Sequence, residues 1–407
     1  LVYAFDVFMG IYESEGWNLR DAAISILQNN LYGLDIDKRA YQLSYFALMM
    51  KARQYNRRIL TPSNEEERVK PNVFEIKESN NIYRDLLTGT SVNQQAKDDF
   101  TSLLNQMYDA KEYGSLLEVK PIDFDNLRLA LQNQELAMFD TVIKEDIIPL
   151  IDCAKLLSQK YDVVITNPPY TPISSCSVKL QDYVKKNYPD SKTDFCSVFI
   201  ERCKEFTLKN GYQAMITMHS WMFLSSFEKL REKLQHIDTI NMVHLGARAF
   251  EEIGGEVVQT TSFVLRNRHI KNNKGIYCRL VTPTTQDGKE KMFLAAENRY
   301  VTKQALFKII PGEPVAYWVT KNVLKVFLNS VSAAKIAEFK HGMSTGKNDA
   351  VVRFWQEVDF SSIAFDIKTH EELYASRKRF VPYNKGGEFR KWYGNQDYVV
   401  DWENNGF

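Results

Sequence analysis

A tetrapeptide with two consecutive prolines contains the residue types best suited to chemistry in this chain. Asn167, Pro168, Pro169 and Tyr170 follow an apolar run, residues 161–166, that predicts a buried strand. The Asn side-chain oxygen and the next carbonyl can accept two N–H bonds from a planar amine, and the prolines hold the backbone that carries them. The Tyr ring offers a stacking face. The arrangement suits methylation of an exocyclic amine, and the alternative is an Asn-Pro turn that caps the strand.

Composition is typical of a globular protein of two or three domains. The chain has 407 residues, 44% of them hydrophobic and 25% charged, with a net charge of +1. Nucleic-acid binding would therefore depend on local basic patches. Five Cys without a C-x-x-C pair indicate reduced thiols in a cytoplasm. We find no signal peptide, no membrane-spanning run and no metal-binding pair of His, so we expect no metal and no membrane partner.

Strands alternate with helices through the first two thirds of the chain. This rhythm predicts a parallel α/β sheet with helices on both faces, in which ligands bind at the carboxyl ends of strands. Residues 269–330 are predicted to be a linker or connecting region, and residues 291–407 lose the rhythm and are rich in aromatic residues. The predicted strands are 30–37, 73–76, 115–123, 161–166, 211–218, 239–246 and 257–265. The predicted helices are 1–17, 18–28, 38–57, pieces of 80–114, 125–132, 135–159, 194–208 and 222–235.

Asp35 ends the predicted strand 30–37, where a carboxylate can accept the two hydroxyls of a nucleoside ribose. The alternative for Asp35 is the N-cap of the following helix, but Asp37 suits that cap better.

The tetrapeptide resembles the catalytic motif of amino-methyltransferases that use S-adenosylmethionine, and its Asn form resembles the N6-adenine DNA class. The resemblance implies that Asp35 binds the donor's ribose and that Asp123 and Phe124 bind its adenine. It further implies that Asp194, which opens the helix after the catalytic loop, takes part in donor binding. It also implies that Tyr170 and Phe250 sandwich a flipped base. Helix caps remain the alternatives for Asp123 and Asp194, and a core position is the alternative for Phe250.

Three further stretches, residues 218–231, 250–264 and 383–394, resemble the PglX adenine-specific methyltransferases of BREX phage-defence systems. The resemblance implies N6-adenine methylation of double-stranded DNA with a flipped adenine, S-adenosylmethionine as cofactor, and other defence proteins as partners. It implies a Rossmann-like S-adenosylmethionine-dependent methyltransferase core at 1–268, and the start of a mixed α+β target-recognition domain at 331–407.

The family's Gly-rich donor loop and first strand precede a helix like the one at residues 1–17. We therefore expect the chain to be a fragment that binds the donor poorly, with the missing strand lying between those that carry Asp35 and Asn167. In the last part of the chain, basic residues that include Arg390 and Lys391 alternate with aromatic residues such as Trp392. They suit contact with DNA phosphates and bases, and the alternative is a solvated basic face.

Two other functions stay open at this point. One is an amino-methyltransferase that acts on protein glutamine or on RNA, since Asn-Pro-Pro-Tyr also occurs in those classes. The other is a DNA-binding defence component whose methylation is vestigial.

Overall fold

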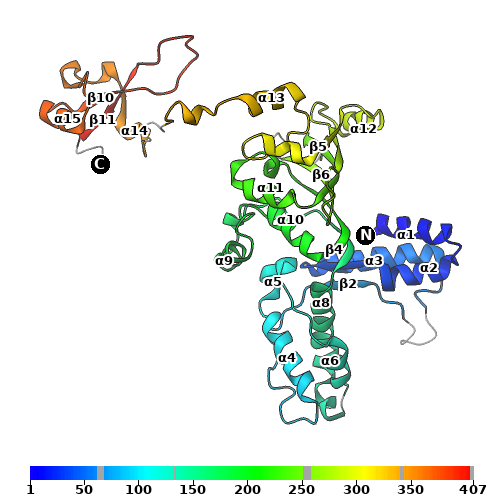
Figure 1. Ribbon diagram of the computed structural model, residues 1–407. Coiled ribbons are helices and arrows are strands. Elements are labelled where there is room, and N and C mark those ends of the chain that lie inside the picture. Colours follow the sequence, from blue (N-terminus) through cyan, green and yellow to red (C-terminus); the bar gives the residue numbers. More distant parts are fainter. Residues whose placement is uncertain (62–67, 133, 251–257, 340–342, 344, 404–407) are drawn as a thin grey trace. The chain divides into compact units, whose positions relative to one another are not determined.

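The computed structural model describes residues 1–61, 68–132, 134–250, 258–339, 343 and 345–403. It divides into two compact units, Leu1–Asn329 and Ser330–Phe407. Each unit has its own sheet (Figure 1). None of the helices in these ranges is both long and apolar enough to span a bilayer.

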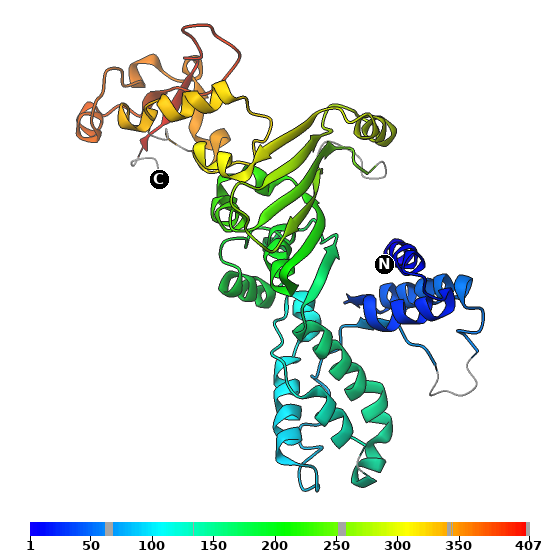
Figure 2. The same cartoon turned by 45° about the vertical axis from the view of Figure 1, so that its right-hand side comes forward.

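The first unit is built around a six-stranded mixed sheet with the order β3-β4-β6-β5-β7-β8. Figure 2 shows these strands side by side. Strands β3, β4, β5 and β7 run in one direction, whereas β6 and β8 run antiparallel to their neighbours. The strands are β3 (Tyr161–Thr166), β4 (Thr207–Met218), β5 (Asp238–Ala247), β6 (Gln259–Arg266), β7 (Lys274–Arg279) and β8 (Arg299–Lys303).

A cross-strand row of large side chains forms the centre of this sheet's core. Met215, Phe263, Met242 and Tyr277 are register partners on four adjacent strands, and all are buried. They pack in one cluster with Ile200 and with residues of the helices α10 (Phe195–Phe206) and α11 (Glu228–Leu234). Burying each large apolar side chain contributes roughly 1.5–3 kcal/mol, so this row fixes the register of the strands.

A separate two-stranded parallel sheet, β1 (Tyr32–Asp35) and β2 (Asn72–Glu75), belongs to the same unit. Helices α1 (Val2–Ser14), α2 (Leu19–Ser25) and α3 (Lys38–Tyr55) pack around one core next to it. Helices α4 (Gln94–Gln106), α6 (Phe124–Ala130) and α8 (Ile148–Ser158) share another core. The other helices of the unit are α5 (Ala110–Tyr113), α7 (Asp140–Val142), α9 (Val178–Asn187), α12 (Gln286–Leu294) and α13 (Lys321–Asn329).

The second unit holds a three-stranded antiparallel sheet with the order β10-β11-β9. Its helices are α14 (Asn348–Val351) and α15 (His370–Ser376), and its strands are β9 (Val352–Phe354), β10 (Phe380–Tyr383) and β11 (Tyr398–Asp401). The unit is therefore α+β.

Two expectations about the sheet are wrong. The sheet is mixed rather than parallel, because β6 returns after a connection of only residues 248–258, and a parallel crossover needs about a dozen residues or more. Residues 269–330 are not a linker, since they contribute β7 and β8 to the sheet and add α12 and α13.

The strand predicted at 115–123 is also wrong, because side chains satisfy the backbone of this segment. The buried Arg202 guanidinium donates to the carbonyls of Ser115 at 2.9 Å and Leu117 at 2.7 Å. The Tyr183 hydroxyl donates to the Leu116 carbonyl at 3.0 Å and accepts from the Glu118 N–H at 3.3 Å. With these groups bonded to side chains, a 3₁₀ turn at Gly114–Leu116 replaces the strand.

Candidate functional site

One edge of the six-stranded sheet collects the carboxyl ends of β3, β4, β5 and β7, because these strands are parallel to one another. Asn167, His219 and Arg248 directly follow β3, β4 and β5. The predicted catalytic tetrapeptide and the segment that leads to Phe250 therefore start from the same edge. In α/β sheets this is where ligands bind.

The Asn-Pro-Pro-Tyr loop is held against the start of α10. The Cys196 thiol donates to the Pro169 carbonyl, with Sγ at 3.6 Å, and the Phe195 N–H donates to the Thr171 carbonyl at 3.1 Å. Pro168 is buried, whereas Asn167 is exposed beyond the end of β3. The loop is thus held by hydrogen bonds from the first turn of α10, whereas the Asn167 side chain is exposed and accessible to a ligand.

Tyr170 is half-buried, and its hydroxyl has no hydrogen-bond partner among the described residues. Burial, with a smaller contribution from Cys196, raises the pKa of Tyr170 to about 12. The hydroxyl itself is buried, which leaves the ring as the part of this side chain suited to contact a base.

Asp194 is the N-cap of α10, one of the two roles considered for it. Its carboxylate accepts the Ser197 N–H at 2.8 Å and the Ser197 hydroxyl at 2.9 Å. The side chain is buried, and this burial raises the pKa of Asp194. A role in donor binding stays a prediction.

Asp35 lies half-buried at the end of β1, and its Oδ1 accepts the Asp37 N–H at 2.8 Å. Asp37 is the N-cap of α3, accepting from the N–H groups of Arg39 and Ala40 at 2.7 and 3.0 Å, as predicted. Because Asp37 takes the cap, the Asp35 carboxylate is left at the strand end with one oxygen oriented by the backbone.

Asp123 caps α6 by accepting the Asn126 N–H at 3.0 Å. The carboxylate is exposed, but the neighbouring Phe124 ring is buried in the core that α4, α6 and α8 share. The cap role is therefore observed, and contact of either residue with a donor adenine stays a prediction.

Phe250 is half-buried and ends the described segment after β5; residues 251–257 of the stretch that resembles the family lie outside the described residues. At the end of β5 the backbone turns sharply, with positive φ at Gly246 (68°) inside the strand and at Arg248 (57°) directly after it. This turn takes the chain away from the ladder at the same edge from which Asn167 emerges.

Sequence reasoning missed a buried polar row next to this edge. Thr217, Thr261, His244 and Arg279 are register partners across β4, β6, β5 and β7, one step beyond the apolar core row. His244 Nε2 lies 2.8 Å from Nδ1 of His219, the residue that follows β4. Two His that each lie near a strand end were the signal in the sequence that could have revealed this pair.

Burial, with nearby His219, Arg279 and Lys289, lowers the pKa of His244 to about 3, and burial also lowers the pKa of His219. Both rings are therefore neutral at neutral pH, and a single proton lies between them. The Arg279 guanidinium stacks over Trp318 with Cζ 5.2 Å from the ring centroid. The carboxyl edge thus combines polar and aromatic side chains without a buried negative charge among these named residues.

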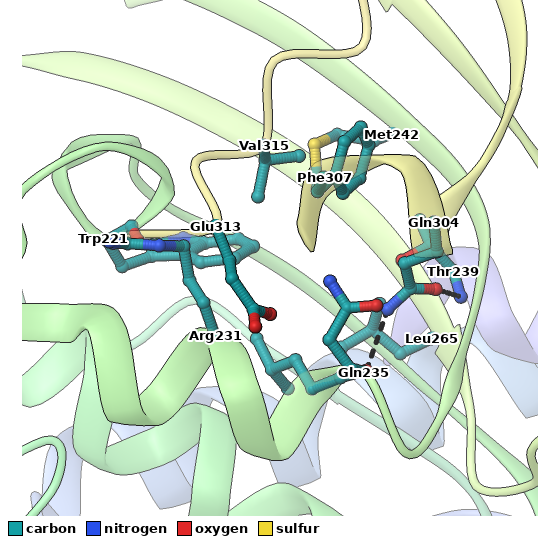
Figure 3. A pocket seen from close by; sticks show the side chains of 11 residues that line it. Trp221, Arg231, Gln235, Thr239, Met242, Leu265, Gln304, Phe307, Glu313 and Val315 are labelled. Atoms are coloured by element: carbon teal, nitrogen blue, oxygen red, sulfur yellow. Dashed lines mark hydrogen bonds between the residues drawn. The ribbon is translucent and has the colours of Figure 1, made fainter. Parts of the chain in front are cut away.

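A cavity of about 20 Å³ lies where β5 begins, at the opposite edge of the sheet (Figure 3). The Gln304 side chain bridges it by accepting the Thr239 N–H and donating to the Leu234 carbonyl. This volume holds about one water molecule. A second cavity, of about 260 Å³, is lined by Tyr32, Asn72 and neighbours near the starts of β1 and β2. Neither cavity is lined by a predicted site residue, so the candidate site is the open carboxyl edge.

In the second unit, the predicted DNA-contacting residues Arg390 and Lys391 are exposed, next to Trp392, which is 89% exposed. The Lys391 Nζ lies 5.9 Å from the centroid of the Trp392 ring. Two other basic residues of the same group are engaged internally: Arg379 pairs with Asp401, and Lys378 donates to a backbone carbonyl. The segment around residues 389–393 is therefore an accessible part of the group.

Comparison with known proteins finds a methylase family and relatives that are named methyltransferases. The model of the Eco57I restriction-modification methylase family matches residues 29–250, more than half of the chain. Adenine-specific methyltransferase PglX of Lacticaseibacillus casei (strain Zhang) is 42% identical over 421 residues, covering 100% of this chain and 34% of that protein. Adenine-specific methyltransferase BrxX of Escherichia coli O9:H4 (strain HS) is 36% identical over 434 residues, covering 100% and 35%.

The chain thus spans about a third of the length of these curated relatives. Among solved structures, a nuclease-deletion mutant of the Type ISP restriction-modification enzyme LlaGI, in complex with a DNA substrate mimic, aligns with a TM-score of 0.45. It is 13% identical, and the alignment covers 80% of this chain and 24% of that one.

The first unit is an α/β domain, and the Asn-Pro-Pro-Tyr segment lies at the carboxyl edge of its six-stranded sheet. The chain belongs to the Eco57I restriction-modification methylase family.

Proposed function

We propose that the intact protein is a site-specific DNA methyltransferase that transfers a methyl group from S-adenosylmethionine to N6 of adenine, within a phage-defence or restriction-modification system. The observation that carries the proposal is Asn167, exposed beyond β3 on a loop that two prolines and α10 hold in place. The family match and two relatives named adenine-specific methyltransferases support it.

The chemistry of the chain's own residues is orientation of the amine. The Asn167 side-chain oxygen and the Pro168 carbonyl accept the two N6 hydrogens, which draws the nitrogen lone pair out of conjugation with the ring. Bound S-adenosylmethionine supplies an electrophilic methyl group on a sulfonium. With the donor bound, the N6 lone pair would form the N–C bond as the S–C bond breaks, and the amine would then lose one proton to solvent. Holding the two reacting atoms in line supplies most of the catalysis.

A base inside a duplex cannot reach this edge, so the target adenine is extruded from the helix and held in the site. Tyr170 and Phe250 provide the two stacking faces. Both lie half-buried in segments that leave the carboxyl edge, and no hydrogen bond to another described residue engages the Tyr170 hydroxyl.

The residues present fit only part of S-adenosylmethionine. Asp35, with Oδ1 oriented by the Asp37 N–H, suits the ribose hydroxyls, and Asp123 suits the adenine amino group. Asp194 is buried and its carboxylate caps α10, so it would affect the donor by positioning this helix. A Gly-rich loop for the methionine end is not among residues 1–407.

An open edge in the sheet supports the idea that another strand completes the donor site. Among the described residues β3 pairs only with β4, and β1 pairs only with β2. Val163 and Ile165 of β3 are 53% and 69% exposed. The Tyr32 and Tyr161 rings at the starts of β1 and β3 lie 5.5 Å apart. Unpaired apolar edges are unfavourable, so we propose that a parallel strand from outside residues 1–407 fills this place and completes a Rossmann-like sheet with helices on both faces.

The second unit would begin a target-recognition domain. Its exposed Arg390, Lys391 and Trp392 suit contact with phosphates and bases of double-stranded DNA. Other proteins of the defence system are proposed as partners. All five cysteines are unpaired in the structure, which fits a cytoplasmic location.

Two other functions have less support. A protein-glutamine methyltransferase would not need an α+β unit with an exposed basic and aromatic segment of this kind. A defence component with vestigial methylation would not need an accessible Asn167 on an anchored loop.

The test is Asn167→Ala in the full-length protein, with Asn187→Ala, an exposed Asn at the end of α9, as the matched control. Methylation of target duplexes should fall by far more than tenfold in the first variant and stay near wild type in the second, with unchanged circular dichroism. A loss within about tenfold, equivalent to about 1.4 kcal/mol in the barrier, would show that Asn167 does not hold the reacting amine.

A further inference from the structure

The segment between β5 and Phe250 leaves the sheet through a bulge. The register of β5 against β6 shifts between His244 and Gly246, and Gly246 has a positive φ of 68°. A Cβ on Gly246 would lie 3.0 Å from the Val281 Cγ1 atom, so the backbone passes close to the end of β7. A bulge next to a site redirects the chain that follows it, which here is the chain that carries Phe250.

Lys289 of α12 holds this bulge. Its side chain is only 4% exposed, and Nζ donates to the carbonyl of the bulged residue Leu245 at 2.6 Å and to that of Leu280 at 2.7 Å. Burial lowers the pKa of Lys289. Both hydrogen-bond acceptors that the described residues give this ammonium are backbone carbonyls, at the ends of β5 and β7. Burying a cation costs free energy of folding. A contribution to stability alone therefore does not explain why a Lys ammonium occupies this position.

Gln286, one turn earlier on the same helix, holds the other end of the segment. Its Nε2 donates to the Ala249 carbonyl at 2.9 Å, directly before Phe250. Thr285 caps α12 by accepting the Gly288 N–H at 3.1 Å, so the helix presents both side chains from a fixed start. Gln286 and Lys289, at i and i+3 of one helix, therefore donate hydrogen bonds to the carbonyls of Ala249 and Leu245. These two carbonyls lie on either side of the turn.

We propose that α12 positions Phe250: Lys289 and Gln286 fix the backbone from Leu245 to Ala249 so that the Phe250 ring is held where it stacks on the extruded adenine. The inference rests on the proposed function, because it needs Phe250 to stack on the target base. Lys289 and Gln286 are positioning residues, since they act on the base through Phe250. If Lys289 and Gln286 only stabilised the sheet, the effect of replacing them on the reaction would be independent of Phe250.

The experiment uses the full-length protein and the variants Phe250→Ala, Lys289→Met and Gln286→Ala. Lys291→Met is the matched control, since Lys291 lies on the same helix with its side chain exposed and paired to Asp287. Each variant, and each positioning variant combined with Phe250→Ala, is measured for kcat/KM on a target duplex. Base extrusion is measured as the fluorescence of 2-aminopurine placed at the target adenine. Circular dichroism and thermal unfolding report the fold.

We expect Lys289→Met to lower kcat/KM by about tenfold to a hundredfold, because a misplacement of about 1 Å costs about that much. Gln286→Ala should cost severalfold, and both should weaken the 2-aminopurine signal while Lys291→Met stays near wild type. Combined with Phe250→Ala, neither positioning variant should add a further loss, because side chains that act through one group are not additive.

Two results would overturn the positioning role. One is that the losses in kcat/KM of a positioning variant and of Phe250→Ala add up in the double variant. The other is that Gln286→Ala and folded Lys289→Met give the same 2-aminopurine signal as Lys291→Met. If Lys289→Met does not fold, Gln286→Ala decides alone, because the exposed Gln286 can be truncated with little risk to the fold. If Phe250→Ala itself changes neither readout, the inference fails at Phe250, and the Asn167→Ala result shows separately whether the proposed function still stands.

Discussion

The His219–His244 pair should make the stability of the protein depend on pH. His244 is 4% exposed, and its Nε2 lies 2.8 Å from His219 Nδ1. Burial first, and then the neighbouring His219, Arg279 and Lys289, lowers the pKa of His244 from 6.5 to about 3. The folded protein therefore keeps this ring neutral over a pH range in which the unfolded chain protonates it.

The sign and size of the effect follow from these two pKa values. Between about pH 6.5 and pH 3 the unfolded state holds one more proton at this site, so the free energy of unfolding falls as the pH falls. The slope is about 1.4 kcal/mol per pH unit. Between about pH 8 and pH 5 the contribution of His244 should therefore decrease by roughly 2 kcal/mol.

The change to make is His244→Gln, with His236→Gln, an exposed His, as the control. Urea unfolding of the full-length protein at about pH 8 and pH 5 can be followed by tryptophan fluorescence, since the Trp318 ring lies 6.4 Å from His244. The Gln side chain cannot take up the proton. The stability difference between wild type and His244→Gln should thus shrink by roughly 2 kcal/mol at the lower pH, and that between wild type and His236→Gln should not. Equal losses for wild type and His244→Gln would refute the reasoning.

Three further results are expected. Tyr170→Phe should reduce methylation only mildly and Tyr170→Ala severely, because base–aromatic stacking contributes about 1–3 kcal/mol and the hydroxyl has no hydrogen-bond partner in the part of the chain that the structure describes; equal damage in kinetic assays would exclude stacking. Arg202→Met should destabilise the protein by roughly 2–5 kcal/mol, since two carbonyls lose their buried donor, whereas Lys209→Met at an exposed position of β4 should have little effect in urea unfolding. Residues 1–407 should bind S-adenosylmethionine far more weakly than a version extended upstream, because the strand proposed between β1 and β3 would carry the Gly-rich loop; equal and tight binding in titration calorimetry would contradict this.

Local signals in the sequence predicted what depends on neighbouring residues. The strand at 161–166 is in place, as are the strand at 73–76, within one residue, and the cap by Asp37. The roles of Asp35, Asp123, Asp194 and Phe250 toward ligands stay predictions. The cap positions of Asp123 and Asp194 were open alternatives, and the structure shows them.

Long-range contacts decided the rest. Arg202 lies 87 residues from Ser115, so no local pattern showed that it would take the carbonyls of a segment that reads as a strand. The sequence predicted which residues are candidates for the chemistry, and it correctly placed Asn167 after a strand and Asp35 at a strand end, because prolines, caps and apolar runs act within a few residues. Only the tertiary structure decided that β6 inserts between β4 and β5, that β7 and β8 extend the sheet, and that Lys289 reaches the carbonyl before the Phe250 turn. Strand order and the partners of buried charges depend on which distant groups satisfy each other's hydrogen bonds once the chain is packed.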